Sequence, residues 1–174
     1  MKRLPTAQFA EFIEFFPPLE LPLSLLPDLS QIPSDPLPLP GVLQDAFILP
    51  FESDEMDEFT EYIPYGRISG TKDYYAMIYW KAGVMRYEFI LGTYSAEGDP
   101  LSHAILGGLR YEEEGVLHSV AVIHEDLSIS IAEGIAESDD KDLNPEQTQT
   151  YQMAISPSGV IMYETNEEDK EEQF

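Results

Sequence analysis

The stretch that decides the fold is Tyr74-Tyr-Ala-Met-Ile-Tyr-Trp80, which is rich in the aromatic and apolar residues that favour a pleated, partly buried sheet. Residues 81–83 break this run, and Gly83 offers the positive φ that a hairpin turn needs. The next stretch, 84–94, alternates between an apolar set and a charged set, namely Met85, Tyr87, Phe89 and Leu91 against Arg86 and Glu88. Such alternation predicts two antiparallel strands with one face buried and the other exposed to water.

Further strands are expected on both sides of this pair, at 63–69, 101–111, 116–124, 127–135, 148–156 and 160–164. The strand at 116–124 is apolar on both faces and is expected to be central. Gly107 and Gly108 interrupt their strand and predict a bulge or a bend. Short connections favour antiparallel pairing of sequential strands. We therefore predict a mainly β protein with a minor α+β character, in which about seven strands form an antiparallel meander folded as a curved sheet, an open barrel or a sandwich.

The first 50 residues have a different character. Thr6 to Phe16 predicts an amphipathic helix with Thr6 as its N-cap. Residues 17–50 hold nine of the 14 prolines, interleaved with leucines, and predict an extended arm across the sheet or its edge, with a possible short helix at 42–49. The expected organisation is a single domain: a helix and Pro/Leu-rich arm packed on the sheet (1–50), an antiparallel β domain (51–164) and an acidic tail (165–174).

The chain is strongly acidic, with 33 acidic and nine basic residues and a formal net charge of −24. This charge argues against nucleic acid and anionic membranes as direct ligands, because both require clusters of Lys and Arg. It permits a basic protein partner or divalent cations. There is no cysteine, so disulfides and thiolate metal sites are excluded. We expect no signal peptide and no membrane helix, which makes a cytoplasmic location the default.

Three segments together carry a resemblance. Residues 74–85 combine a strand, a Lys-Ala-Gly turn and a second strand, Tyr151-Gln-Met-Ala-Ile-Ser-Pro-Ser-Gly-Val-Ile161 ends the sheet, and Phe15-Phe16-Pro17 precedes Leu21-Pro22-Leu23. In this combination the chain resembles a widespread group of uncharacterised Bacteroidetes β-meander proteins, whose last turn usually reads Asp-Gly where this chain has Ser158-Gly159. The resemblance implies a fold and no assigned activity.

No catalytic motif is found. His118 and His124 would lie on one strand with Cα atoms about 20 Å apart, which is too far to share one metal ion. The sequence contains no Gly-x-Ser-x-Gly elbow and no phosphate loop. No catalytic residue, metal site or cofactor is predicted.

Three functions stay open. The first is a non-catalytic acidic binding protein for a basic partner, for example an immunity-like protein that masks a basic toxin. The second is a small-ligand-binding protein or enzyme that uses the interior of the curved sheet, with His103, His118, Tyr79 and Tyr87 as its polar groups. The third is a calcium-loaded module built on the oxygen-rich segment 139–144, although this segment lacks the Gly and terminal Glu of an EF-hand loop.

Overall fold

The structure, a computed structural model, describes residues 3–28, 35, 37–52, 58–136 and 148–164. Two α-helices and a short 3-10 helix accompany the strands: α1 (Ala7–Glu14), α2 (Gly41–Phe47) and η2 (Leu49–Phe51). The strands are β1 (Pro18–Leu19), β2 (Leu23–Leu25), β3 (Glu61–Ile68), β4 (Tyr74–Gly83), β5 (Arg86–Ser95), β6 (Pro100–Glu112), β7 (Gly115–Ile123), β8 (Ser128–Ala136), β9 (Gln149–Ile155) and β10 (Ile161–Glu164).

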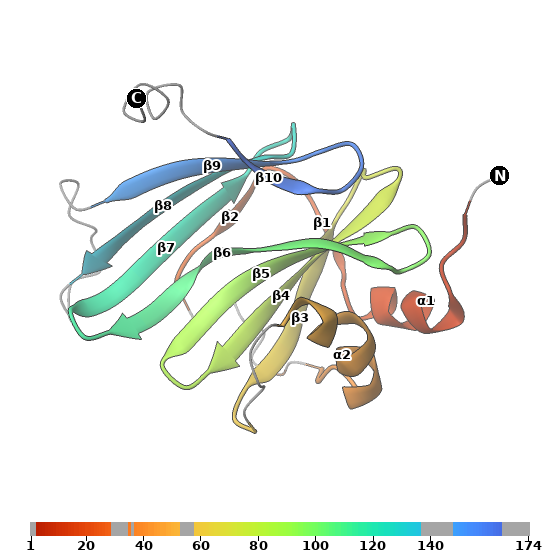
Figure 1. Cartoon of the computed structure of the whole chain (residues 1–174), viewed down its shortest axis with the longest axis horizontal. Coiled ribbons are helices and arrows are strands. Elements are labelled where there is room, and N and C mark those ends of the chain that lie inside the picture. Colours follow the sequence, from red (N-terminus) through yellow and green to blue (C-terminus); the bar gives the residue numbers. More distant parts are fainter. Residues whose placement is uncertain (1–2, 29–34, 36, 53–57, 137–147, 165–174) are drawn as a thin grey trace, which may run out of the picture.

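All of these strands belong to one ten-stranded sheet, whose order is β1-β3-β4-β5-β6-β7-β8-β9-β10, with β2 paired to β7. From β3 to β10 every strand pairs antiparallel with the next one in sequence. The sheet is strongly twisted and does not close, as Figure 1 shows. The predicted fold class, a mainly β antiparallel meander forming a curved sheet, is confirmed.

Strands β4 and β5 are buried on both faces. Trp80 and Phe89 point into a first core, which also takes side chains from β6 to β9 and from β2. Tyr79 and Ile90, one residue along each strand, point into a second core formed with α1 and α2. The expectation that one face of this hairpin is exposed to water was wrong, because the two helices cover it (Figure 1) and even the charged Glu88 is only 4% exposed.

The predicted N-terminal helix is confirmed as α1, and the Thr6 hydroxyl caps it by accepting a hydrogen bond from the Phe9 N–H at 3.2 Å. Phe9, Phe12 and Phe16 are fully buried against the sheet, as their spacing predicts. The Tyr94 hydroxyl donates to the Phe47 carbonyl at 2.7 Å and ties α2 to the same face. The helical stripe is therefore a core element.

The Pro/Leu-rich arm contributes two strands that the sequence did not predict. β1 pairs parallel to β3 at the edge of the sheet, and β2 pairs antiparallel to β7, with Leu23 opposite Ile123 and Leu25 opposite Ala121. The partner residues of β2 lie beyond the point where β7 stops pairing with β6, since the β6–β7 ladder ends at Gly108 and Ser119. β2 thus occupies the place on β7 that β6 leaves.

The predicted bulge at Gly107 and Gly108 is present. The register of β6 against β5 shifts between Phe89 and Ile90. Gly108 has a φ of +137°, and a Cβ at this position would overlap the Tyr87 carbonyl oxygen. Only glycine fits at position 108, so this residue of the sequence permits the bulge at which β6 separates from β7.

The separation of β6 from β7 divides the sheet into two halves, one from β3 to β6 and the other from β7 to β10. The β9–β10 hairpin contacts the β3–β6 half. The Thr93 hydroxyl donates to the Gly159 carbonyl at 2.6 Å, and the Ile161 N–H donates to the Ser102 hydroxyl at 3.2 Å. β10 therefore touches β6 at one end, although no ladder joins the two strands. The turn at 157–159 is as predicted, whereas the β4–β5 turn lies at Val84 and Met85 instead of 81–83.

Several sequence expectations lie outside the described residues. They concern part of the Pro/Leu-rich arm (29–34 and 36), the calcium-ligand segment at 139–144 and the acidic tail at 165–174.

Replacing Leu25 by alanine should lower the free energy of unfolding by about 2–5 kcal/mol, because this fully buried side chain of β2 fills the space between the two halves of the sheet. Chemical denaturation of the variant measures the loss. The neighbouring Leu26→Ala is the matched control, since Leu26 is 42% exposed and its loss should change stability by less than about 0.5 kcal/mol. Equal losses of unfolding free energy in the two variants would show that β2 is not inserted between the two halves of the sheet.

Candidate functional site

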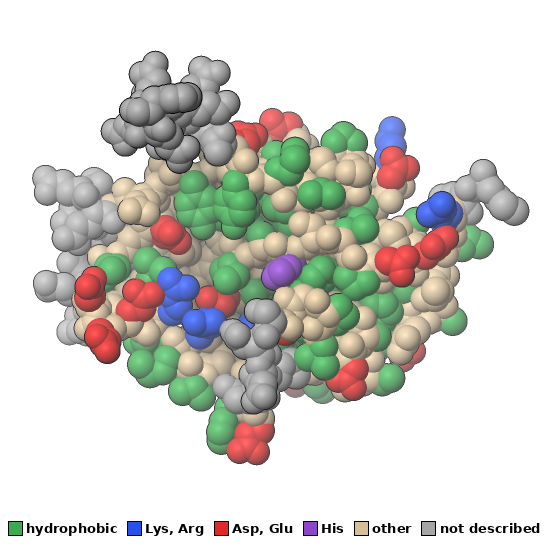
Figure 2. Space-filling model, viewed as in Figure 1, with side chains coloured by type: hydrophobic (Ala, Val, Ile, Leu, Met, Phe, Trp, Pro, Cys, Tyr) green, Lys and Arg blue, Asp and Glu red, His purple; other side chains and the backbone are tan. Residues whose placement is uncertain are grey.

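A groove of about 300 Å³ opens on the sheet beside β6 and is lined by side chains of β5 to β10. Its polar lining residues are Glu88 on β5, His103 and Arg110 on β6, Ser119 on β7, Glu133 on β8, Tyr151 on β9 and Tyr163 on β10. Basic, acidic and hydrophobic side chains gather on this face of the molecule in Figure 2. Six consecutive strands thus each contribute a polar group to one depression.

Strand register brings these residues to one face. Ser119 lies directly opposite Glu133 in the β7–β8 ladder, and residues directly opposite in a ladder point to the same side of the sheet. The same face carries Ala121 and Ile131 further along the two strands, where it enters the first core. The groove is therefore the outer, polar end of a face whose inner end is buried.

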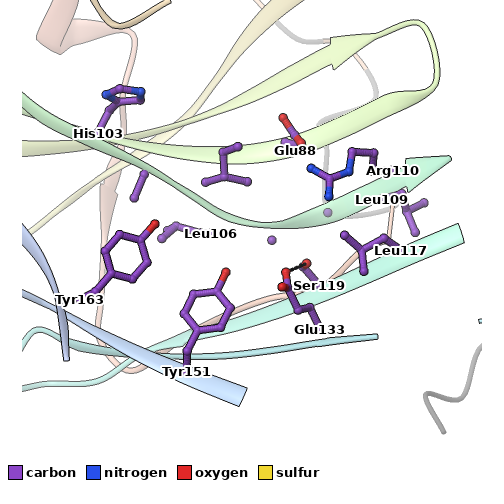
Figure 3. Close-up of a pocket in the computed structure, with 14 residues that line it drawn as sticks. Glu88, His103, Leu106, Leu109, Arg110, Leu117, Ser119, Glu133, Tyr151 and Tyr163 are labelled. Carbon is purple, nitrogen blue, oxygen red and sulfur yellow. Dashed lines mark hydrogen bonds between the residues drawn. The ribbon is translucent and has the colours of Figure 1, made fainter. Parts of the chain in front are cut away.

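Glu133 and the two tyrosines form the centre of the groove. The Ser119 hydroxyl donates to the Glu133 carboxylate at 3.2 Å (dashed line in Figure 3). The rings of Tyr151 and Tyr163 lie with centroids 6.1 Å apart, tilted by 35°, and extend from β9 and β10 toward β6. Burial, with contributions from Glu133 and Tyr163 and against an opposing contribution from Arg110, raises the pKa of Tyr151 to about 12, so its hydroxyl stays protonated near neutral pH.

The other charged groups are already paired. The Arg110 guanidinium Nε donates to Glu112 Oε1 at 2.8 Å, and Arg86 Nε lies 3.7 Å from Glu88 Oε1. Burial raises the pKa of Glu88, while the nearby Arg86, Lys81 and Arg110 act in the opposite direction. Glu88 is thus a desolvated carboxylate beside arginines, whereas Glu133 lies near Tyr151 and accepts a hydrogen bond from Ser119.

The four residues named as ligand candidates from the sequence are not brought together. His103 lines the groove, with its ring centroid 5.0 Å from that of Phe51. His118 lines a different depression with Glu112 to Glu114, and burial lowers its pKa. Tyr79 is fully buried in the second core, and Tyr87 packs against Trp80 with centroids 6.4 Å apart.

Sequence reasoning missed Arg110, Ser119, Glu133, Tyr151 and Tyr163 as a group. A signal for two of them was available, because Ser119 and Glu133 each continue an otherwise apolar period-two set and so place a polar group on a face that is buried further along the strand. The tyrosines carried no comparable signal, since tyrosine is ordinary on a sheet face.

Among the described residues, no group of three His, Asp or Glu side chains is placed to hold a metal ion. No helix within the described ranges has the length and apolar character needed to cross a membrane. Comparison of the chain with family models, with curated proteins and with solved structures gave no match. The resemblance to the Bacteroidetes β-meander proteins therefore stays a prediction.

Glu88→Gln should raise the melting temperature at about pH 7, because burial disfavours the ionised carboxylate of the wild-type protein. The folded-state pKa of Glu88 lies above its unfolded value, so the wild-type protein gains stability as the pH falls through that raised pKa. The advantage of the variant should accordingly shrink toward about pH 4, where the wild-type carboxyl group becomes protonated. Thermal melts across this range measure both effects.

Glu113→Gln provides the control, because Glu113 is exposed in the β6–β7 turn. It should leave the melting temperature nearly unchanged at both pH values. A Glu88→Gln protein that melts lower than wild type at about pH 7 would show that the pairing of Glu88 with arginine outweighs the cost of its burial.

Proposed function

We propose that this protein is a non-catalytic binding protein whose groove accepts a basic group, an ammonium or a guanidinium, from a protein partner. The observation that carries the proposal is the position of Glu133 in the groove near Tyr151, whose ring is paired with that of Tyr163. A carboxylate next to aromatic faces favours a cation in two ways, through a charge-assisted hydrogen bond and through the ring quadrupoles.

The charge of the whole chain supports the same partner class. A formal net charge of −24 attracts basic proteins over a distance of about one Debye length and repels acidic ones. Within the groove, Arg110 pairs with Glu112 and Glu88 with Arg86, whereas the Glu133 carboxylate accepts a hydrogen bond from an uncharged hydroxyl, that of Ser119. Long-range attraction and the local site thus favour one ligand chemistry.

The rival function, a ligand site in the interior of the curved sheet, has less support. The space between the two halves of the sheet is filled by buried side chains, among them Trp80, Phe89 and Ile131, each of which is at most 1% exposed. The serine of the groove donates its hydrogen bond to a carboxylate, Glu133, and this arrangement does not activate the hydroxyl as a nucleophile in the way that a histidine base does.

The proposal predicts how a hexa-arginine peptide binds at moderate salt. Glu133→Gln should weaken binding by about ten- to a hundredfold, since a charge-assisted hydrogen bond is worth about 1.5–3 kcal/mol. Calorimetry or fluorescence anisotropy measures the affinity. A hexa-glutamate peptide should not bind to either form of the protein.

Glu11→Gln is the matched control, because Glu11 is exposed on α1 and its replacement removes the same single charge. A general attraction to the acidic surface would weaken equally in both variants. Equal affinities of the two variants for hexa-arginine would therefore contradict a role for the groove, whereas a selective loss in Glu133→Gln supports it.

A further inference from the structure

The outer edge of β10 presents backbone groups beside the groove. In an antiparallel ladder, the N–H and C=O of alternate residues point toward the neighbouring strand and those of the residues between point away. Ser156 N–H donates to the Val160 carbonyl at 2.8 Å, so Val160 is a residue whose backbone groups point toward β9. Counting in twos from Val160, Met162 and Glu164 also bond to β9, whereas Ile161 and Tyr163 direct their backbone groups away from it.

The Ile161 N–H confirms this direction, because it donates to the Ser102 hydroxyl on β6 at 3.2 Å. The sheet order ends at β10, so no further strand of the described chain continues the ladder. Three backbone groups lie on this edge: the Ile161 carbonyl, the Tyr163 N–H and the Tyr163 carbonyl. The Tyr163 side chain lines the groove, so the edge and the groove adjoin (Figure 3).

We infer that the edge of β10 and the groove together bind an extended basic segment of a partner protein by strand addition. The inference rests on the proposed function and specifies the form of the ligand. An added strand would bond to the three outward backbone groups, as peptides do when they extend a sheet. A short ladder suffices on this sheet, because β1 and β2 join it through two and three residues.

Strand addition also sets the spacing of the basic residues. Side chains that lie directly opposite one another in neighbouring strands share a face. Every second side chain of the added strand would therefore lie on the face of Tyr163, where Tyr151 and Glu133 also line the groove. The preferred segment has Arg or Lys at alternate positions.

Charge decides between a basic partner and a second copy of this chain. Two copies that paired edge to edge through β10 would each carry a formal charge of −24 and would place Glu164 residues near the shared seam. Such repulsion is a known protection of sheet edges against self-association. A basic segment meets the same edge with complementary charge.

The test uses the full chain and the peptide acetyl-Arg-Val-Arg-Val-Arg-Val-amide with two N-methylated isomers. One isomer carries methyl groups on the backbone nitrogens of the arginines and the other on those of the valines. Both keep every charge, but each blocks the N–H groups on one edge of the extended peptide. The affinities should differ at least tenfold between the isomers, and the Tyr163 amide should exchange with deuterium at least tenfold more slowly when the unmethylated peptide is bound.

The outcomes separate this inference from the proposed function. Equal binding of the isomers without protection of the Tyr163 amide would show that strand addition is wrong. If hexa-arginine still loses affinity in Glu133→Gln, the proposed binding of a basic group in the groove is supported nonetheless. If Glu133→Gln changes the affinity of neither hexa-arginine nor the Arg-Val peptide, both strand addition and the proposed function are wrong. A protein that dimerises in sedimentation experiments, with Tyr163 protected before peptide is added, would assign the edge to a second copy and overturn the inference.

Discussion

The separation of β6 from β7 at Gly107 and Gly108 is the constraint on which the rest of the structure depends. Gly108 adopts a positive φ in a place where a Cβ would overlap the Tyr87 carbonyl, and the bulge next to it shifts the register of β6 against β5. From there the two halves of the sheet diverge, and β2 fills the place beside β7 with the buried side chain of Leu25. A flat meander would have needed no such insertion.

The groove follows from the same separation. Because β6 pairs with β7 only as far as Ser119, the two halves of the sheet diverge beyond this residue. The inner end of the β7–β10 face packs into the first core through Ile123, Ile129 and Met153, and its outer end carries Ser119, Glu133 and Tyr151. The Ile161 N–H of β10 also donates a hydrogen bond to Ser102 on β6. The site is thus built on strands, which favours preorganised binding.

Local chemistry made much of the fold predictable. The Thr6 cap, the phenylalanine spacing, the Gly107–Gly108 pair and the turn at 157–159 each act over a few residues, and the structure contains them all. The strand β2 was not predictable, because three residues in a proline-rich arm have no pattern of their own and pair only when β7 offers an unpaired edge. Packing of the N-terminal helix on the sheet was predicted, but not that it covers the β4–β5 hairpin, because the alternating pattern of that hairpin is typical of a half-exposed pair of strands.

The candidate site was harder to predict than the fold. Its residues come from six strands, and their meeting depends on the register of every ladder between β5 and β10, which a single sequence does not encode locally. The histidines and tyrosines chosen from the sequence were selected by residue type, and the structure distributes them among the groove, another depression and both cores. Polar residues that continue an apolar face, such as Ser119 and Glu133, were the better guide.

The most direct test of the account is a crystal structure of the protein with a bound arginine-containing peptide. A guanidinium is expected about 2.7–2.9 Å from the Glu133 carboxylate and against the ring of Tyr151. A peptide seated instead on the acidic β6–β7 turn at Glu112 to Glu114, with the groove empty, would contradict it and would reduce the binding to a general attraction between opposite charges.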